Sequence, residues 1–370
     1  MALSLAEEKQ TARLNKEFRD AQSPVLQAIS NQVCGCCYIG NSWTTRSEAD
    51  VMIEHLRLTA SHDLLDIGAG AGWPGLYLAL QTGCAVTLLD LPEIGLRLAE
   101  ARAKADGMAS QLSTVQADAA DMPFPSESFS AISHSDVLCC LEDKLSVLRE
   151  CRRVINANGR MCFTVIRLAD GLKGTSMDRA VQAGPEFIRS EACYPSMLQS
   201  AGWQIIQQDD ITGAFLASTE RMIAAEEKQS ESLRALRGDK ANETAQANLR
   251  SRLQAVAEAG WPRKVEVLTP SDGPPLELAK FMIKNKALVL TVPFHNFKLR
   301  EKIKKDGAIF NKEIKYWIIP GNIEDFDRLA EKYKKLIFDV NQPRIDLPGL
   351  DCRKDATLRR HTQDPHLPRH

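Results

Sequence analysis

The sequence lacks three features that would each assign it to a familiar class of protein. Its formal net charge is only −1 over 370 residues, so it is neither a polycation nor a polyanion throughout. Its longest uncharged run, residues 67–89, carries five glycines and one proline, a composition unlike that of a membrane-spanning helix. Its first ten residues are acidic and have no apolar core, so they do not resemble a signal peptide. We therefore expect a soluble, cytoplasmic protein that makes no membrane contact.

A disulfide framework is also missing. Ten cysteines are spread over the chain, and only Cys34, Cys36 and Cys37 form a cluster. Two of these thiolates could share a zinc ion, but no second pair of Cys or His follows at the spacing of a zinc finger. We interpret the cluster as loop or core thiols in a reducing compartment, and we expect no metal ion.

What the sequence does contain is an alternation of short apolar segments with longer amphipathic ones. The short segments predict strands at residues 63–68, 85–90, 113–118, 129–136, 160–166, 203–211 and 264–269. The longer ones predict helices at residues 74–83, 93–107 and 144–155, with Asn158-Gly159 as the stop of the last, and two helices within residues 217–258 broken near Gly238. Strands that alternate with helices predict an α/β fold with a doubly wound, mainly parallel, Rossmann-like sheet.

Composition divides the chain into several parts. Residues 1–34 predict an N-terminal helical cap, residues 35–269 hold the α/β domain, and the Pro- and Gly-rich residues 270–279 predict a linker. Residues 280–340 carry 14 basic and 8 acidic side chains, in contrast to the acidic part upstream, and predict a small basic α+β domain. Its predicted elements are strands at 287–293 and 316–320 and helices near 297–305 and 324–338. Residues 341–370 have little apolar content and are expected to be disordered.

The most informative segment is the glycine loop, Asp66-Ile67-Gly68-Ala69-Gly70-Ala71-Gly72-Trp73-Pro74-Gly75, which follows the first predicted strand. Glycines at this position allow a ligand to approach the backbone closely. The spacing of Gly70, Gly72 and Gly75 matches the dinucleotide-binding fingerprint, and Asp90 ends the second strand, where an acid binds ribose hydroxyls. The loop by itself therefore fits NAD as well as another nucleoside ligand.

Two further acids favour a ligand other than NAD. Asp66 directly precedes the glycines, and a carboxylate there suits an ammonium group but would repel a pyrophosphate. Asp118 follows the third strand, where a carboxylate can accept a hydrogen bond from the exocyclic amine of adenine. Met122 and Phe124 come soon after it and can pack on the adenine ring.

With these residues in place, the sequence resembles the class I S-adenosylmethionine-dependent methyltransferases, in particular those that act on small molecules. The resemblance rests on three blocks in order: the DxGxGxG segment, the acid that ends the second strand, and QADAADMPFPSESFSAI followed by LRECRRVINANGRM. It covers residues 35–269. Residues 156–159 depart from the usual Lys-Pro-Gly-Gly form, which changes a turn and leaves the cofactor site intact.

The resemblance implies that S-adenosyl-L-methionine is the cofactor and assigns roles along the strand ends. The glycine loop would lie against its methionine and ribose, with Asp66 orienting the loop and holding the ammonium group. Asp90 would bind the ribose hydroxyls, and Asp118 would meet the adenine amine. The implied cofactor-binding residues are Asp66, Gly68, Ala69, Gly70, Gly72, Asp90, Leu91, Asp118, Ala119 and Ser133.

Methyl transfer is an in-line displacement that needs alignment in a water-poor site more than acid–base assistance. His134, at the end of the fourth strand, is the candidate general base because imidazole titrates near neutral pH; the alternative is a polar residue that caps the next loop. Aromatic and cationic residues around the core are candidate contacts for a small organic substrate, with plain packing as the alternative for each. They are Tyr38, Trp43, Arg46, Arg167 and Tyr194.

The C-terminal part resembles a small domain of unknown function found in bacterial mobile-element primases and topoisomerase-like proteins. The resemblance rests on Val292-Pro293, Gly307–Asn311 and Lys315–Pro320. Clustered lysines beside Phe310 and Trp317 could bind nucleic acid by charge and stacking. The alternative, which we favour for the aromatic residues, is that they form the core of a module this small.

Taken together, these patterns predict an enzyme that transfers a methyl group from S-adenosyl-L-methionine to a small organic acceptor. The sequence has no Asn/Asp-Pro-Pro-Tyr motif and no Pro-Cys nucleophile, which argues against DNA as the primary substrate. Two alternatives stay open: a cofactor-binding scaffold tethered to nucleic acid by the C-terminal module, and a NAD-dependent oxidoreductase. The sequence predicts neither the acceptor nor the oligomeric state.

Overall fold

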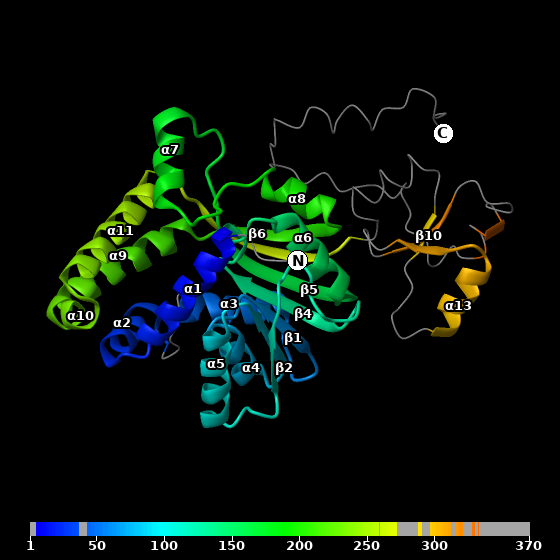
Figure 1. Cartoon of the computed structure of the whole chain (residues 1–370), viewed down its shortest axis with the longest axis horizontal. Coiled ribbons are helices and arrows are strands. Elements are labelled where there is room, and N and C mark those ends of the chain that lie inside the picture. The colour runs from blue at the N-terminus through cyan, green and yellow to red at the C-terminus, as the bar shows by residue number, and fades with distance from the viewer. Residues whose placement is uncertain are drawn as a thin grey trace.

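A seven-stranded sheet with helices on both faces organises the molecule (Figure 1). The computed structural model describes residues 5–36, 43–258 and 260–271 and, beyond them, residues 288–290, 297–311, 316–320, 328–329 and 332. The predicted doubly wound, mainly parallel α/β sheet is confirmed.

The strands follow the order β3-β2-β1-β4-β5-β7-β6. Strands β1 to β5 run parallel to one another, whereas β7 is antiparallel to both β5 and β6. The order turns back between β1 and β4, so the carboxyl ends of these two strands border the topological switch point where open α/β sheets bind ligands. The bounds are β1 Asp63–Ile67, β2 Ala85–Asp90, β3 Leu112–Gln116, β4 Phe129–Ser135, β5 Ile155–Ile166, β6 Trp203–Asp210 and β7 Arg263–Pro270.

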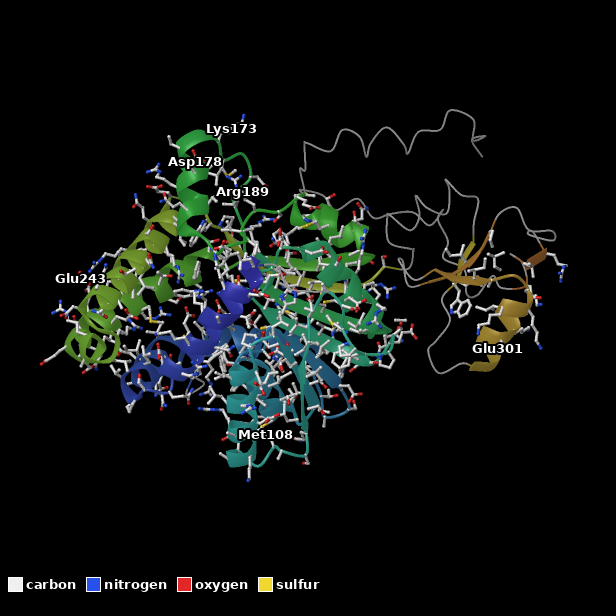
Figure 2. The ribbon with its side chains drawn as sticks, in the orientation of Figure 1. Met108, Lys173, Asp178, Arg189, Glu243 and Glu301 are labelled. Atoms are coloured by element: carbon white, nitrogen blue, oxygen red, sulfur yellow. The ribbon has the colours of Figure 1, made fainter. Side chains whose placement is uncertain are left out.

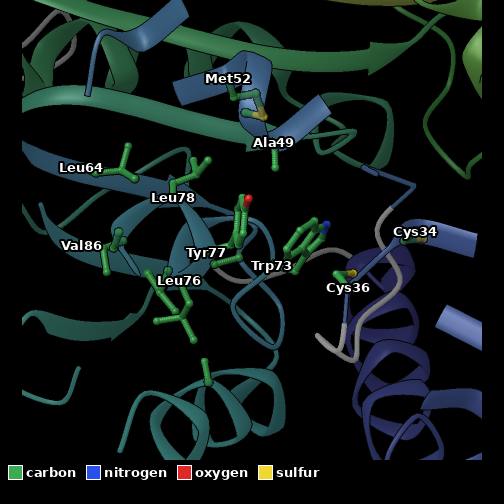
Figure 3. Close-up of a cluster of buried hydrophobic side chains, with 14 of the residues drawn as sticks. Cys34, Cys36, Ala49, Met52, Leu64, Trp73, Leu76, Tyr77, Leu78 and Val86 are labelled. Atoms are coloured by element: carbon green, nitrogen blue, oxygen red, sulfur yellow. The ribbon is translucent and has the colours of Figure 1, made fainter. Parts of the chain in front are cut away.

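Two hydrophobic clusters cover the two faces of the sheet, because successive side chains of a strand alternate between faces. Leu64 and Leu88 belong to the first cluster, which includes side chains of α3, α4 and α5 (Figure 3). Leu65 and Leu89 belong to the second, which includes side chains of α6 and α8. These helices are α3 Arg46–Leu56, α4 Gly75–Thr82, α5 Glu93–Ala105, α6 Lys144–Val154 and α8 Tyr194–Ser200.

Further helices pack beside the sheet, α2 against α9, α9 against α11 and α11 against α7. We call α7, α9, α10 and α11 the cap helices. A third cluster, which includes Phe215 and Trp261, joins them to the short helix η1 and to Ile166 at the end of β5. The elements are α1 Leu5–Asp20, α2 Pro24–Cys34, η1 Leu138–Cys140, α7 Gly174–Ala183, α9 Thr212–Lys228, α10 Ser230–Arg237 and α11 Asp239–Ala257. In Figure 2, Lys173 and Asp178 lie at α7, and Glu243 lies on α11.

Three boundaries differ from the prediction. Helix α6 ends at Val154 and β5 begins at Ile155, so Asn158 and Gly159 lie within a strand instead of ending a helix. Residues 212–257 form three helices, although the predicted break at Gly238 is confirmed. Strand β7 extends through Pro270, where it pairs with Trp203, so the first residue of the predicted linker belongs to the sheet.

The described part of the C-terminal module contains a second, three-stranded antiparallel sheet of order β8-β10-β9. The basic helix α13 (Phe297–Lys305) has the predicted bounds, and β9 is an additional strand. The strands are β8 Leu288–Leu290, β9 Ile309–Asn311 and β10 Tyr316–Ile319. Among the helices that the structure describes, none has the length and apolar character needed to cross a membrane.

Candidate active site

The predicted cofactor residues meet along one edge of the sheet. Asp66 lies on β1 opposite Ser133 of β4, and Asp90 ends β2 opposite Gln116 of β3. Asp118 follows β3 by two residues. Because β1 to β4 are parallel and adjacent, these acids and the glycine loop share the carboxyl edge of the sheet.

The backbone of the glycine loop explains why it needs glycine. Gly68, Gly70 and Gly72 have φ angles of 62°, 51° and 95°, in the left-handed region that residues with a Cβ rarely adopt. A Cβ on Gly68 would lie 2.5 Å from Cγ2 of Val137, so space is restrictive as well. The N–H of Gly68 donates to the carbonyl of Leu89 at 2.8 Å and fastens the loop to β2. The loop is therefore a preformed turn whose backbone can approach a ligand.

Asp66 organises this loop from within the protein. Its side chain is 1% exposed, and its two oxygens accept hydrogen bonds from Ser133 Oγ at 2.6 Å and from the N–H of Gly75 at 3.1 Å. Burial raises the pKa of Asp66 to about 7, even though both hydrogen bonds act to lower it. Through the hydrogen bonds to Ser133 and Gly75, Asp66 can orient the loop, which is the role predicted for it. Ser133, fully buried and donating to Asp66, lies behind the loop.

Asp90 ties the end of β2 to the loop. Its Oδ2 accepts a hydrogen bond from the N–H of Gly70 at 2.7 Å, and its Oδ1 accepts one from the N–H of Leu91 at 2.8 Å. Burial raises the pKa of Asp90 to about 6, opposed by the same two backbone N–H groups. Asp90 as a whole residue is half-buried, and each carboxylate oxygen already accepts one backbone hydrogen bond.

The third acid lies beside an apolar surface. Asp118 Oδ1 accepts a hydrogen bond from the N–H of Ala120 at 2.8 Å, which shapes the turn after β3. Ala119 is 8% exposed and belongs to the same cluster as Leu89 and Met122. A polar group beside an apolar wall is the combination that an adenine ring requires.

His134 lies in the core, which differs from the expectation that it faces a substrate. It is 0% exposed, its ring stacks on Phe163 at a centroid distance of 4.4 Å, and neither ring nitrogen has a hydrogen-bond partner. Burial lowers the pKa of His134 to about 3, so the ring is neutral at physiological pH. This geometry gives the imidazole no route to a proton at the carboxyl edge.

Helix α1, within the residues predicted as an N-terminal helical cap, contacts the glycine loop. Phe18 is 4% exposed, and a Cβ on Gly70 would lie 2.9 Å from its ring. Asn15 accepts a hydrogen bond from the N–H of Ile94 at 3.2 Å, and Gln10 donates to the carbonyl of Cys140 at 3.0 Å. Helix α1 thus contacts the loop, the start of α5 and η1. An amphipathic helix carries no signal of which surface it will cover.

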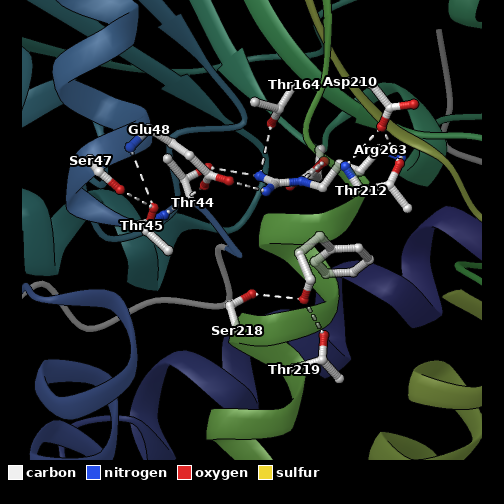
Figure 4. Close-up of polar contacts among 12 residues, drawn as sticks. Thr44, Thr45, Ser47, Glu48, Thr164, Asp210, Thr212, Ser218, Thr219 and Arg263 are labelled. Atoms are coloured by element: carbon white, nitrogen blue, oxygen red, sulfur yellow. Dashed lines mark hydrogen bonds and ion pairs between the residues drawn. The ribbon is translucent and has the colours of Figure 1, made fainter. Parts of the chain in front are cut away.

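A buried ion-pair network connects the site to the rest of the fold (Figure 4). Arg263 of β7 is 0% exposed and donates to Asp136 at 2.9 Å and to Glu48 of α3 at 2.8 Å. Burial alone would lower the pKa of Arg263, but the charges of Asp136 and Glu48 outweigh it and raise that pKa. Asp136 directly follows β4 and has a φ of 54°. The network holds the end of β4 against β7 and α3, and its members are too far apart in sequence to have been paired in advance.

The predicted substrate residues do not all lie together. Trp43 packs edge-on against Phe215 of α9, with their ring centroids 5.4 Å apart. Arg167 directly follows β5. Tyr194 is 3% exposed, and burial holds its pKa well above the ordinary value. Arg46 is exposed on α3, where it donates to the hydroxyl of Tyr77 at 3.3 Å. Tyr38 lies outside the described residues.

The cysteine cluster is part of the packing around α2. Cys34 and Cys36 are buried in the first hydrophobic cluster, near Trp73 (Figure 3). A hydrogen bond with Cys36, together with burial, raises the pKa of Cys34. Cys37 lies outside the described residues. Within the described part of the chain, no group of three or more metal-binding side chains comes together.

Comparison with known proteins identifies relatives of this sheet. Residues 65–163 match the model of a family described as a methyltransferase domain. Methyltransferase GfsG of Streptomyces halstedii is 27% identical over 169 residues, which are 44% of this chain and 59% of that protein. The 27-O-demethylrifamycin SV methyltransferase of Amycolatopsis mediterranei is 28% identical over 173 residues, 46% of this chain and 63% of that protein. The chain therefore spans less than two thirds of the length of these relatives.

A solved structure shares the fold at low sequence identity. Phosphoethanolamine N-methyltransferase 2 of Haemonchus contortus, in complex with phosphomonomethylethanolamine and S-adenosylhomocysteine, has a TM-score of 0.58 at 17% identity. The alignment covers 70% of this chain and 60% of that one. Its fold, the strand order and the family match agree with one another. Residues 65–163 thus match a methyltransferase domain, and the sheet that contains them shares the fold of this solved methyltransferase.

Proposed function

We propose that the protein transfers a methyl group from S-adenosyl-L-methionine to a small organic acceptor. The observation that carries the proposal is the carboxyl edge of β1 to β4. There, a loop of left-handed glycines lies against Asp90, beside the apolar surface that includes Ala119.

The residues at this edge fit the cofactor. A nucleoside with an amino-acid tail needs backbone it can approach, an acceptor for ribose hydroxyls and an apolar surface for adenine. Gly68 and Gly70 supply the first, since they turn at φ angles of 62° and 51° and carry no Cβ that would keep a ligand from the backbone. The carboxylate of Asp90 supplies the second, and Leu91 and Ala119 supply the third.

Catalysis follows from positioning in this proposal. The bound cofactor supplies a methyl group already activated on a sulfonium. The glycine loop and Asp90 orient that group, and α1, packed on Gly70 through Phe18, excludes water from above the loop. His134 is not assigned the role of a base, because the core encloses its ring. An acceptor that must lose a proton would release it to water after transfer.

A small organic acceptor is supported by residues near the ends of β4 and β5 and by relatives. Trp43, Arg167 and Tyr194 lie near the ends of β4 and β5, where an acceptor approaches the site. The Amycolatopsis mediterranei relative and the Haemonchus contortus neighbour act on, or bind, small organic molecules according to their names. We further propose a cytoplasmic location, which is supported by seven described cysteines without a disulfide, although Cys193 is disulfide-bonded.

Transfer of a labelled methyl group tests the proposal. The full chain is incubated with methyl-labelled S-adenosyl-L-methionine and a metabolite extract, beside a Gly68→Val variant whose side chain would collide with Val137. We expect label in small molecules with the wild type and none with the variant. Binding of S-adenosylhomocysteine without any transfer would favour the scaffold alternative, and binding of NADH in its place would favour the oxidoreductase.

A second role, nucleic-acid contact through the C-terminal module, has one supporting observation. Lys304 of α13 lies over the half-buried ring of Trp317 at 5.6 Å, and Lys302 and Lys305 are exposed. Charge beside an aromatic ring is the arrangement that binds single strands. A Lys302→Glu, Lys305→Glu double variant of the full chain should lose fluorescence-anisotropy binding to a labelled single strand at low salt. A flat curve for the wild type would remove this role.

A further inference from the structure

A cavity of about 540 Å³ lies between two of the cap helices, α7 and α11. This volume suits a small organic molecule. Most side chains that line it are polar, and two of them are arginines. The lining includes Ser176, Arg179, Asn248, Ser251, Arg252 and Glu258.

The cavity adjoins the part of the sheet where an acceptor must approach. Ala180 and Ala255 line it, and both belong to the hydrophobic cluster that contains Cys139 of η1 and Ile166 at the end of β5. Strands β4 and β5 end there, next to the glycine loop of β1. In open α/β sheets, ligands bind beyond the carboxyl ends of the strands at the switch point.

Arg252 is the one cation of this lining that the described residues leave without an anionic partner. Its guanidinium carbon lies 5.6 Å from the centre of the Trp43 ring, and it makes no hydrogen bond or ion pair to a described residue. Arg179, in contrast, pairs with Glu258 at 3.7 Å. The carboxylate of Glu17 raises the pKa of Arg252 through its charge, but Glu17 is itself paired with Arg13 at 2.6 Å.

The environment of Arg252 makes an anionic ligand favourable. The side chain is half-buried, and burial lowers the pKa of its guanidinium more than the charge of Glu17 raises it, so its lost hydration is not fully replaced. A guanidinium binds carboxylate and phosphate groups through two parallel hydrogen bonds. The indole of Trp43 beside it offers a flat apolar surface for the rest of such a molecule.

Resting on the methyl transfer proposed above, we propose that this cavity binds the methyl acceptor, and that the acceptor carries an oxyanion held by Arg252. The oxyanion is a carboxylate or a phosphate. Trp43 packs against the apolar part of the acceptor. Arg252 is then a specificity-determining residue, and the cavity selects acids over their neutral analogues.

Binding of matched probes to the full chain tests this assignment. With saturating S-adenosylhomocysteine, isothermal titration compares benzoate with benzamide and phenyl phosphate with benzyl alcohol. We expect each acid to bind the wild type at least tenfold more tightly than its neutral partner. Whichever of benzoate and phenyl phosphate binds more tightly identifies the class of oxyanion. An Arg252→Gln variant should lose this preference, and Arg252→Lys should keep part of it. Equal binding of acids and neutral partners by the wild type would overturn the proposal.

Arg250 provides the matched control. It lies on the same helix, is 59% exposed, pairs with Glu227 at 2.8 Å and does not line the cavity. Arg250→Gln should keep the preference for acids, whereas a loss equal to that of Arg252→Gln would contradict a specific role. An Arg252→Glu variant should favour benzylamine over benzoate. If Arg252 only packs on Trp43, all of its variants would bind the four probes as the wild type does.

The same titrations separate this inference from the proposed function. Arg252→Gln should bind S-adenosylhomocysteine within twofold of the wild type, because it lies outside the glycine loop. Cofactor binding without a preference for acids would overturn the inference alone. A preference for acids, measured in buffer without cofactor, in a protein that does not bind S-adenosylhomocysteine would overturn the proposed function and leave the anion site standing.

Discussion

The carboxyl edge of the sheet and the cavity in the cap are built in different ways. The edge consists mainly of backbone from one loop, residues 66–75, held by two strand-end acids. The cavity consists of side chains from α7 and α11, with Trp43 beside it from a segment far upstream. A site made from one continuous backbone segment leaves a short sequence pattern, whereas a site made from scattered side chains leaves none. The comparison predicts that the edge is sensitive to backbone changes and the cavity to charge changes.

The largest effect is expected where the two regions are joined. Replacing Arg263 by alanine would leave Asp136 and Glu48 buried without their partner, which costs about 3–5 kcal/mol of unfolding free energy. Urea unfolding measures this loss. Lys264→Ala is the control, because Lys264 pairs with the exposed Asp210 and such a pair contributes about 0–1 kcal/mol. Equal small losses in the two variants would show that the network does not hold the regions together.

A smaller effect is expected for a backbone change in the glycine loop. Gly70→Ala places a Cβ at a φ of 51° and 2.9 Å from the Phe18 ring, which should cost about 2 kcal/mol and weaken cofactor binding at least tenfold. Thermal unfolding and a cofactor titration check both effects. Gly171→Ala, at a φ of 83° with open space around it, isolates the conformational cost and should leave cofactor affinity unchanged. If both variants bind the cofactor as the wild type does, the loop does not form the site.

The next effect is a pH dependence from His134. Its folded-state pKa is about 3 and its ordinary value is 6.5, so between these pH values only the unfolded chain takes up the proton. Stability is therefore lost as the pH falls below 6.5, and the wild type should lose about 2 kcal/mol relative to His134→Leu between pH 7 and pH 5. The raised pKa values of Asp66 and Asp90 act in the opposite direction, but they are common to both proteins. Urea unfolding at the two pH values gives this difference.

The same variant tests whether His134 takes part in the reaction. His134→Leu should keep the rate of methyl transfer at pH 7 within about threefold, once corrected for the fraction folded. A folded variant that binds cofactor but transfers a hundredfold more slowly would restore the imidazole as a base. A stability difference that does not change with pH would contradict its burial as a neutral ring.

Strand alternation explains why two neighbouring predicted site residues lie in different surroundings. The seven strands and the glycine loop could be predicted because their apolar pattern and glycine spacing are local. Ser133 was expected to bind the cofactor and His134 to act as a base at the same strand end, but neighbouring residues of a strand point to opposite faces. Ser133 contacts Asp66 on one face, so His134 must lie on the other, against Phe163.

Long-range pairs account for what the sequence could not reveal. Asp136 and Arg263 lie 127 residues apart, and nothing near either one indicates its partner. Phe18 on Gly70 depends on how α1 docks, and the unpaired state of Arg252 depends on where the acids of other helices fall. Asn158-Gly159 was interpreted as a helix stop because the pair favours turns, yet pairing with β4 extends β5 back to Ile155.

Titration of the full chain with S-adenosylhomocysteine tests the central claim most directly. The wild type should bind it, and Asp90→Asn should bind it more weakly by about 1–3 kcal/mol, the contribution of hydrogen bonds to a charged group. Asp63→Asn is the control, because that acid is exposed at the opposite end of β1. The account predicts wild-type affinity for Asp63→Asn and a clear loss for Asp90→Asn. No binding by the wild type, or equal affinity in all three proteins, would contradict a methyltransferase cofactor site at the glycine loop.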